Sequence, residues 1–322
     1  MKNILVCGAG GFIGTHLVNK LKLEGNYVIG ADLKYSEYQV SQADEFHVVD
    51  LRDRASVEKI VTEDLYEIYQ LAADMGGAGY IFTGDNDADI MYNSAMINLN
   101  ILNEMVKKKV TRIFYSSSAC IYPAYNQEDP DNPLCSESSA YPAAPDSEYG
   151  WEKLFSERLY KSYEKNYNIR VRIARFHNVF GPLGAWNNGK EKAPAALCRK
   201  VAVSDSEVEV WGPGTQTRSF LYIDECLKGI EKIVNSNCSD PLNLGSERMI
   251  SINDLVNLIA NRARKNISIK NIAGPIGVMG RNSHNDFIYK TIGWKPDDNL
   301  EYGIDKTYAW ILEQITKENT DK

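Results

Sequence analysis

Four side chains near the middle of the sequence could together carry out proton transfer. Tyr149 and Lys153 are four positions apart, so on a helix they lie one turn apart on the same face. An ammonium group beside a phenol favours the phenolate, because a tyrosine otherwise loses its proton only at a pKa of about 10. This pair could therefore take the proton of a hydroxyl group. Ser118 and Cys120 stand at the predicted end of a strand, where the thiol could serve as a second proton-transfer group.

The element that would hold a cofactor beside these residues lies near the start of the chain. Residues 3–7 form a short apolar run, a glycine-rich turn follows, and the next strand ends at Asp32. Gly8 and Gly11 allow the backbone to turn tightly and to approach a pyrophosphate, which the N-terminus of the next helix holds through free N–H groups. Gly14 allows close packing of that helix on the strand. Asp32 can accept hydrogen bonds from a ribose and would repel a 2′-phosphate, so the pattern favours NAD over NADP.

Strands and helices alternate through the first half of the sequence. Strands are predicted at residues 27–31, 47–51, 67–71, 112–116 and 170–176, with helices at 56–62, 90–109 and 149–166. This alternation predicts an α/β fold of the Rossmann type, a doubly wound parallel sheet with both faces covered. Ligands bind at the carboxyl ends of such strands, where Asp50, Leu51, Ala72 and Ser118 fall.

The alternation breaks near residue 178. We therefore predict an NAD-binding domain, residues 1–178, and a mainly nucleotide-sugar-binding smaller lobe, residues 179–322, with segments near 216–246 rejoining the first domain. The proline-rich stretch between 122 and 148 is expected to be a long functional loop. Residues 75–79 are too rich in glycine for a helix and form either a flexible loop or a wall against a ligand.

Composition excludes several classes of function. The chain has 322 residues and a formal net charge of −7, which argues against wholesale binding to nucleic acid or acidic membranes. No apolar run approaches the roughly 18 residues that a membrane span needs. Six cysteines show no paired or metal-ligating spacing. We therefore expect reduced thiols, no metal site and a cytoplasmic location.

The sequence resembles the extended short-chain dehydrogenase/reductase superfamily, whose members act on nucleotide sugars. The matching motifs are Gly8…Gly11…Gly14, Asp32, Asp50-Leu51, Leu71-Ala72-Ala73, Ser118, Tyr149…Lys153 and Arg218-Ser219-Phe220…Asp224. The likeness is greatest to the epimerases of this superfamily that act at C3 and C5 of GDP-mannose. The runs that carry it are residues 71–77, 117–123, 175–178, 191–196, 216–220, 223–226 and 280–283.

This resemblance implies a reaction and a role for each site residue. Tyr149, assisted by Lys153 and Ser118, would take the C4 hydroxyl proton while NAD accepts hydride. Cys120 would then act as the base and Lys192 as the acid at C3 and C5, before hydride returns to C4. The implied cofactor contacts are Gly8, Gly11, Phe12, Ile13, Gly14, Asp32, Asp50, Leu51, Ala72, Tyr149 and Lys153.

The resemblance also implies how the substrate, GDP-mannose or a close relative, is bound. Arg218 and Arg281 would clamp the diphosphate, because a planar guanidinium binds phosphate oxygens in pairs. The other implied contacts are Gly76, Ser118, Asn178, Lys192, Lys200 and Gln216. For Lys200 an ordinary solvated position on a helix is an equally good interpretation, and Trp211 is expected in the core. A homodimer is also implied.

Other functions remain open at this point. A C4-epimerase or a C4-dehydrogenase acting on a related GDP-sugar needs neither Cys120 nor Lys192. A 4,6-dehydratase would need an acidic pair directly after the active-site hydroxyl, where this sequence has Ala119-Cys120. A protein that senses NAD without catalysis would have little reason to keep Ser118, Tyr149 and Lys153 together.

Overall fold

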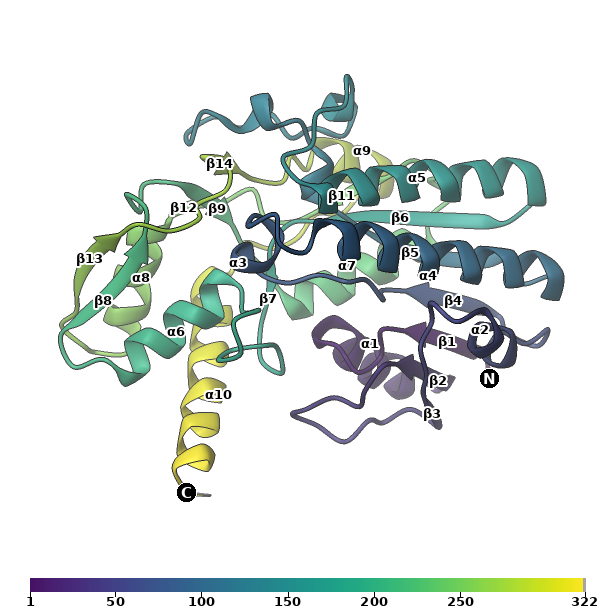
Figure 1. The fold of residues 1–322 in the computed structure, drawn as a ribbon, viewed down its shortest axis with the longest axis horizontal. Coiled ribbons are helices and arrows are strands. Elements are labelled where there is room, and N and C mark those ends of the chain that lie inside the picture. The colour runs from purple at the N-terminus through teal and green to yellow at the C-terminus, as the bar shows by residue number, and fades with distance from the viewer. Residues whose placement is uncertain (321–322) are drawn as a thin grey trace.

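The computed structural model describes residues 1–320, and its largest element is a seven-stranded parallel sheet (Figure 1). The strands follow the order β11-β6-β5-β4-β1-β2-β3. They comprise β1 Asn3–Cys7, β2 Tyr27–Asp32, β3 Glu45–Val48, β4 Glu67–Gln70, β5 Arg112–Ser118, β6 Arg170–Phe176 and β11 Leu242–Leu244. The chain winds outward in both directions from the β1–β4 pair, and ligands bind at such a switch point. The fold class predicted from the sequence is confirmed.

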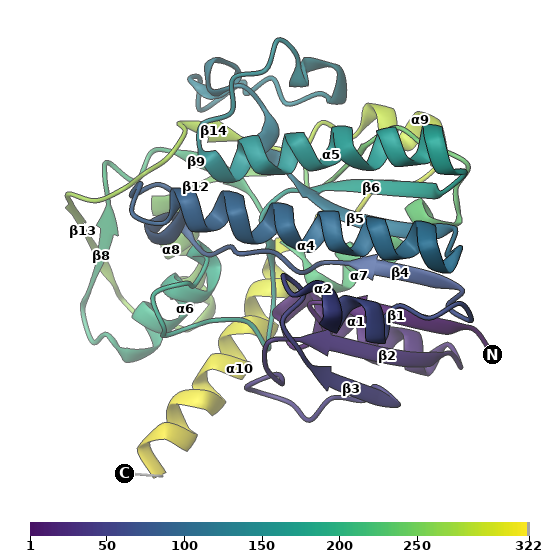
Figure 2. The ribbon, with the colours of Figure 1, turned by 45° about the vertical axis from the view of Figure 1, so that its right-hand side comes forward.

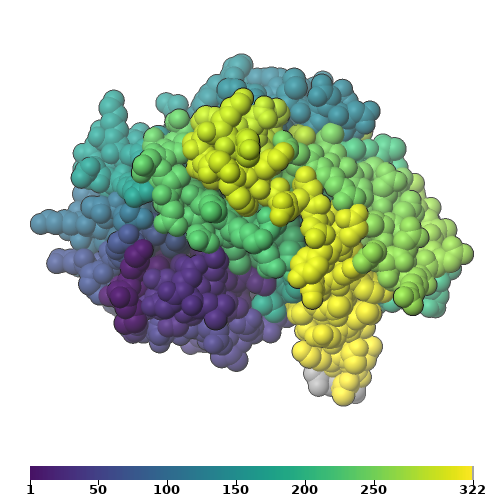
Figure 3. Space-filling model, turned by 180° about the vertical axis from the view of Figure 1, so that it is seen from behind, coloured from purple at the N-terminus to yellow at the C-terminus, as the bar shows by residue number. Residues whose placement is uncertain are grey.

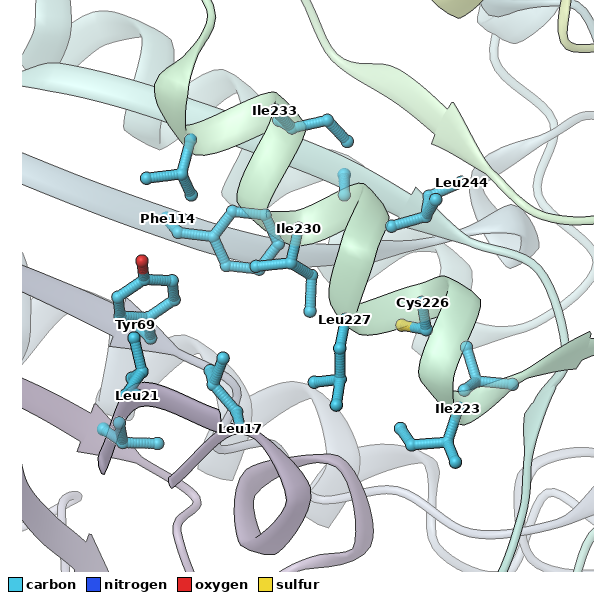
Figure 4. Packing of buried hydrophobic residues seen from close by; sticks show 14 of the residues in the cluster. Leu17, Leu21, Tyr69, Phe114, Ile223, Cys226, Leu227, Ile230, Ile233 and Leu244 are labelled. Atoms are coloured by element: carbon cyan, nitrogen blue, oxygen red, sulfur yellow. The ribbon is translucent and has the colours of Figure 1, made fainter. Parts of the chain in front are cut away.

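Helices cover both faces of this sheet. On one face α4 and α5 lie side by side along their length, as Figures 1 and 2 both show, with α2 beside α4. On the other face α1 packs against α7, and Figure 4 shows Leu17 and Leu21 of α1 facing Leu227 and Ile230 of α7. The helices are α1 Phe12–Leu23, α2 Arg54–Ile60, α4 Asp87–Lys108, α5 Glu148–Tyr167 and α7 Ile223–Asn235. These two apolar layers hold the strand ends in place.

A smaller lobe stands at the carboxyl end of the sheet (Figure 1). Its core is formed by α6, α8, α10 and the parallel pair β8 and β13. These elements are α6 Ala193–Val203, β8 Glu207–Trp211, α8 Ile252–Arg262, β13 Ser268–Ile272 and α10 Leu300–Thr320. Figure 3 shows α10 projecting from the body of the molecule. This lobe thus has a hydrophobic core of its own.

Several short elements connect the two lobes. β9 pairs with both β12 and β14 in a three-stranded sheet, and β10 pairs with β7. After the smaller lobe, α9 returns to pack against β11 of the large sheet. The elements are β7 Val179–Phe180, β9 Thr217–Ser219, β10 Leu221–Tyr222, β12 Met249–Ser251, β14 Gly280–Arg281 and α9 Asp286–Ile292. The chain therefore crosses between the lobes several times after residue 178.

The structure differs from the predicted elements in two places that border the site. The third strand ends at Val48, so Asp50 and Leu51 lie in a turn rather than in the predicted strand 47–51. The glycine-rich stretch 75–79 leads into a one-turn helix, α3 Ala78–Ile81, which the glycine content alone had argued against. Short helices need little propensity when their residues pack against neighbouring elements.

The long loop between Tyr122 and Ser147 folds over the end of α5 (Figure 1). It contains two short 3₁₀ helices, Ala124–Gln127 and Glu137–Ala140, and a third, Ala119–Ile121, leads into it. Tyr122 and Cys135 are fully buried beneath it. The loop is therefore a packed layer of the protein, and two of its side chains enter the site described next.

Candidate active site

Ser118, Tyr149 and Lys153 meet at the carboxyl end of β5. Ser118 is the last residue of β5, and the other two lie in the first turns of α5. The α5 helix begins here because the Ser147 side chain accepts a hydrogen bond from Gly150 N at 3.3 Å. The Lys153 Nζ lies 5.7 Å from the centre of the Tyr149 ring, and the Ser118 side chain acts to lower the pKa of the Tyr149 hydroxyl. All three side chains are buried.

Gly150 explains how α5 can approach Cys120 so closely. A Cβ atom at this position would lie 2.1 Å from the Cys120 carbonyl oxygen, which no side chain tolerates. The glycine between Tyr149 and the rest of the helix therefore lets the phenol and the thiol share one site. Sequence reasoning missed this residue, although its place directly after Tyr149 was visible.

The charge states in this cluster differ from the expectation that Lys153 makes Tyr149 acidic. Burial raises the pKa of Tyr149, and a negative Cys120 would raise it further, whereas Ser118 and Arg281 act in the opposite direction. Burial lowers the pKa of Lys153, and its ammonium donates to the Ser116 carbonyl at 2.9 Å. Desolvation is thus the largest influence on the pKa of this phenol.

Cys120 is held by a residue that the sequence assigned to a different task. The Nη1 of Arg281 donates to the Cys120 Sγ at 3.1 Å. The other two nitrogens of this guanidinium also donate, to the Asp146 carboxylate at 2.8 Å and to the Gln127 side-chain oxygen. The structure therefore places Arg281 on the thiol, on Asp146 and on Gln127, whereas the resemblance assigned it to the diphosphate.

Lys192 reaches the same cluster from the smaller lobe. It is the residue directly before α6, and burial lowers its pKa while Cys120 and Cys226 would raise it. The loop after β4 fixes its approach, because a Cβ on Gly77 would lie 2.5 Å from the Glu191 carbonyl oxygen. The stretch 75–79 thus packs against backbone of the substrate lobe. A Cβ on Gly76 would likewise clash, in this case with the side chain of Tyr80.

The remaining substrate candidates fall into two groups. Arg218 lies beside Arg281 in the register of β9 and β14, and its guanidinium donates to the carbonyls of Ile276 and Val278 at 2.9 and 2.7 Å. Burial, together with the charge of Arg281, lowers the pKa of Arg218 to about 10. A half-buried guanidinium bound only to carbonyls within residues 1–320 is suited to receive an anion.

Gln216 and Asn178 also lie close to this lobe junction. The Gln216 amide donates to the Trp211 carbonyl at 3.1 Å, while its buried oxygen has no partner within residues 1–320. Asn178 donates to the Ser219 carbonyl at 3.0 Å. Lys200 instead donates to the Glu209 carbonyl at the surface. This agrees with the alternative interpretation of Lys200 as a solvated helix residue. Trp211 is 42% exposed rather than in the core.

The turn before α1 has the shape that a pyrophosphate needs. Gly8 has a φ of +84°, and a Cβ on Gly14 would lie 1.9 Å from the Gly8 carbonyl oxygen. No side chain caps the N-terminus of α1 at Gly11, so the N–H groups of Phe12 and Ile13 point out of the helix unshielded. Gly10, which the sequence reasoning did not single out, is equally constrained, because its Cβ would lie 2.1 Å from the Lys34 carbonyl oxygen.

Two acidic residues flank this turn. Asp32 ends β2 and accepts hydrogen bonds from Gly10 N at 2.9 Å and Leu33 N at 2.7 Å. Asp50 is oriented by Arg52, which donates to its two oxygens at 2.9 and 2.6 Å, and this pairing lowers the Asp50 pKa. These two side chains and the glycine turn together fit the adenosine end of NAD.

The backbone at Leu51 and Ala72 completes this side of the site. The Leu51 carbonyl is fixed by the Asn100 amide at 3.2 Å. A Cβ on Gly8 would lie 2.9 Å from Ala72 N, so the turn after β4 and the glycine turn after β1 are in direct contact. Both positions therefore contribute backbone rather than functional side chains.

Comparison with known proteins bears on the chemistry of this arrangement. The model of the NAD dependent epimerase/dehydratase family matches residues 4–245. GDP-mannose 3,5-epimerase of Arabidopsis thaliana is 46% identical over 317 residues, which covers 98% of this chain and 83% of the relative. GDP-mannose 3,5-epimerase 1 of Oryza sativa subsp. indica is also 46% identical, with the same coverage of both chains.

Solved structures of lower identity show the same fold. UDP-glucose 4-epimerase of Thermotoga maritima, solved with UDP-glucose, has a TM-score of 0.84 at 22% identity and covers 97% of this chain and 99% of its own. UDP-glucuronic acid 4-epimerase of Bacillus cereus, solved with UDP-glucuronic acid and NAD, has a TM-score of 0.81 at 24% identity with the same coverage. From the family match and the 46% identity over nearly its whole length, the chain belongs to the NAD dependent epimerase/dehydratase family.

Proposed function

We propose that this protein is an NAD-dependent GDP-mannose 3,5-epimerase. The observation that carries the proposal is the thiol of Cys120, held by Arg281 beside the redox residues Ser118, Tyr149 and Lys153. The 46% identity to GDP-mannose 3,5-epimerases supports it. A C4-epimerase has no use for a base directed at carbon, so the thiol favours inversion next to C4.

The first task is proton transfer at the C4 hydroxyl. When bound, NAD supplies a reversible hydride acceptor at a carbinol carbon. Tyr149 takes the hydroxyl proton, and Ser118 hydrogen-bonds the oxygen as it becomes a carbonyl. Lys153 supports the phenolate by its positive charge. Because burial raises the pKa of Tyr149, the phenolate depends on the positive charges of Lys153 and Arg281.

The second task is proton exchange at carbon. A C4 carbonyl makes the hydrogens on C3 and C5 acidic. The Cys120 thiolate removes one such proton, and the Lys192 ammonium gives a proton to the opposite face of the same carbon. One C–H bond is broken and one is formed, so the configuration inverts with no net redox change. Burial lowers the pKa of Lys192, which makes its ammonium a more ready proton donor.

Substrate binding falls to the junction between the lobes. Arg218 is the proposed partner of the diphosphate, because it is half-buried and its guanidinium is bonded to carbonyl oxygens. Gln216, with its unpartnered buried oxygen, and Asn178 are placed to contact polar groups of the nucleotide sugar. Arg281 is bonded to Cys120 and to Asp146, so its guanidinium is already paired with an anion.

The test is incubation of GDP-mannose with the NAD-loaded enzyme in D₂O. We expect deuterium at C3 and C5, and products with the stereochemistry of GDP-galactose and GDP-gulose, identified by NMR and mass spectrometry. Inversion at C4 alone, with no solvent hydrogen in the sugar, would identify a C4-epimerase instead. Accumulation of a C4 ketone would identify a dehydrogenase.

We further propose that the enzyme is a homodimer formed through α4 and α5. Trp151 and Phe155, one turn apart on α5, are 41% and 48% exposed, and Tyr92 and Leu99 on the adjacent α4 are 64% and 37% exposed. Such aromatic side chains on two neighbouring helices suit a second copy of the chain. Sedimentation should give a dimer mass, and Phe155→Glu should give a monomer.

A cytoplasmic location is the last part of the proposal. All six cysteines are free thiols, which fits a reducing compartment. Within residues 1–320, no helix is both long and apolar enough to cross a membrane. Fractionation of the source cells should place the protein with the cytoplasmic fraction.

A further inference from the structure

The loop between Tyr122 and Ser147 supplies two of the three partners of Arg281. Gln127 and Asp146 come from its two ends, and both are buried. Gln127 is itself fixed, because its amide donates to the carbonyls of Tyr122 and Pro123 at 3.1 and 3.2 Å. Its own backbone carbonyl accepts from Met279 N, two residues before Arg281. The loop therefore contacts the chain at β14 through backbone as well as side-chain hydrogen bonds.

Arg281 would not keep its position without a carboxylate. It is 5% exposed and lies beside the half-buried Arg218 in the pairing of β14 with β9, so the two guanidinium groups repel each other. Asp146 forms the ion pair with Arg281. Among the anions it also has the largest effect on the pKa of Arg218. Removing one partner of a buried ion pair leaves an uncompensated charge that moves toward solvent or another anion.

Cys120 is surrounded by charge from every element that packs against it. The cations are Arg281 from β14, Arg218 from β9, Lys153 from α5 and Lys192 before α6. The other titratable groups are Asp146, Tyr149 and the neighbouring thiol of Cys135. Of the four cations, only Arg281 donates a hydrogen bond to the sulfur within residues 1–320. Its orientation is thus the variable that most directly controls the thiolate.

We propose that Asp146 is a positioning residue that holds Arg281 on Cys120 and thereby keeps this thiol ready to act as the base at carbon. This rests on the proposed function, to which it adds a residue that need not touch the sugar. The carboxylate fixes one Nη of the guanidinium at 2.8 Å, so the other Nη faces the sulfur at 3.1 Å. The long loop then serves as the support of the thiol rather than as a lid.

Position and charge predict opposite effects when Asp146 is neutralised. If Asp146 acted only as a negative charge, its removal would stabilise the thiolate, and Cys120 would react at lower pH. If Asp146 acts by holding Arg281, its removal lets the guanidinium leave the sulfur, and Cys120 would react only at higher pH. The direction of the change therefore separates the two roles.

The experiment compares Asp146→Ala, Asp146→Asn and a matched control, Asp131→Ala. Asp131 lies in the same loop and is exposed, so its variant removes the same charge without touching Arg281. The pH dependence of Cys120 alkylation by iodoacetamide is measured by mass spectrometry of its peptide. Deuterium exchange at C3 and C5, and formation of reduced cofactor on mixing with GDP-mannose, are measured on the NAD-loaded enzymes.

We expect Asp146→Ala to move the alkylation profile to higher pH and to slow carbon exchange at pH 7 by about 10-fold or more, since a general base contributes about 10²–10⁴-fold. Reduction of the cofactor should change far less, because Asp146 is not bonded to Ser118, Tyr149 or Lys153, and Arg281 acts on the Tyr149 pKa less than burial, Cys120, Ser118 and Glu152 do. Asp146→Asn keeps a hydrogen-bond acceptor for Arg281 and should restore part of the lost exchange. Asp131→Ala should match the wild type.

Three results would overturn the proposal. They are an alkylation profile that stays in place or moves to lower pH, carbon exchange at the wild-type rate in Asp146→Ala, and equal loss of exchange and of cofactor reduction, which would indicate general damage to α5. Failure of the proposed function would look different. In that case the wild-type enzyme itself would put no deuterium on C3 or C5, while the alkylation profiles would still report on Asp146 and Arg281.

Discussion

The redox half and the carbon-exchange half of the site are built in different ways. Ser118, Tyr149 and Lys153 come from the end of one strand and the first turns of one helix, both part of the large sheet domain. The carbon-exchange half joins Cys120 to Lys192 before α6 and to Arg281 on β14. The first half depends on local geometry. The second depends on how three distant segments pack, and it is therefore the half in which specificity can change without loss of the fold.

Tyr149→Phe should have the largest effect, because both halves depend on the C4 ketone. We expect losses of about 10²–10⁴-fold in cofactor reduction and in deuterium exchange alike, the range ascribed to a general acid–base residue. Stopped-flow absorbance and NMR measure the two. Tyr163→Phe, on the same helix and away from Ser118, is the control. Carbon exchange that survives in Tyr149→Phe would show that the two halves work independently.

Cys120→Ala should separate the halves most clearly. Exchange at C3 and C5 should fall by about 10²–10⁴-fold, because its base is gone, while cofactor reduction at C4 persists. Cys198→Ala removes a buried thiol in the core of the smaller lobe and controls for the deleted sulfur. Exchange at the wild-type rate in Cys120→Ala would remove the thiol from its role and leave a C4 enzyme.

Gly14→Ala tests the packing of α1 on the glycine turn after β1, where the redox half would hold NAD. Its Cβ would lie 1.9 Å from the Gly8 carbonyl oxygen, so α1 must move away from β1. We expect the free energy of unfolding in urea to fall by about 1–3 kcal/mol, as overpacked sites do. NAD affinity should fall as well. In Gly79→Ala the new Cβ would make only ordinary contact, 3.6 Å from Trp211, so unfolding should be nearly unchanged.

Glu152→Gln should have the smallest effect, a shift in pH dependence. Glu152 is fully buried beside Lys153, where its negative charge raises the Lys153 pKa against the lowering by burial. Without that charge the pKa of Lys153 falls, so the ammonium is lost at lower pH. The alkaline limb of kcat/KM should therefore move to lower pH.

Glu152→Gln should keep the hydrogen bonds of the native side chain, so the stability of the variant serves as the control. Ser156 donates to Glu152 at 2.6 Å and the Asn98 amide at 3.2 Å, and a glutamine oxygen can accept both. Stability should therefore change little. An alkaline limb that stays in place would mean that Glu152 is already neutral in the wild type, in keeping with the upward shift that burial gives its own pKa.

The sequence predicted those parts of the site whose geometry is set by neighbours along the chain. The positions of Gly8 and Gly14 could be read from the turn that they must form. Tyr149 and Lys153 share a helix face whatever surrounds them. Gly10 could have been found in the same way, because it lies within the same turn.

The sequence could not predict partners that depend on burial or on distant segments. Arg281 has the residue type of a phosphate ligand, and nothing in its neighbourhood along the chain points to Cys120. Asp146 and Gln127 lie in a loop whose conformation no periodic pattern specifies. Burial raises the pKa of Tyr149, where the sequence had led us to expect that Lys153 lowers it, and a sequence does not reveal burial.

The sequence by itself thus determined the parallel sheet, the glycine turn for NAD and the Tyr149–Lys153 pair. Each follows from a pattern along the chain, namely strands that alternate with helices, glycine at a tight turn and helical spacing. Only the tertiary structure decided that Arg281 faces the thiol. Its partners are fixed by the pairing of two very short strands, β9 and β14, and by a loop that closes over them. In a buried site, where a charge must find its counterion, such packing determines which groups meet.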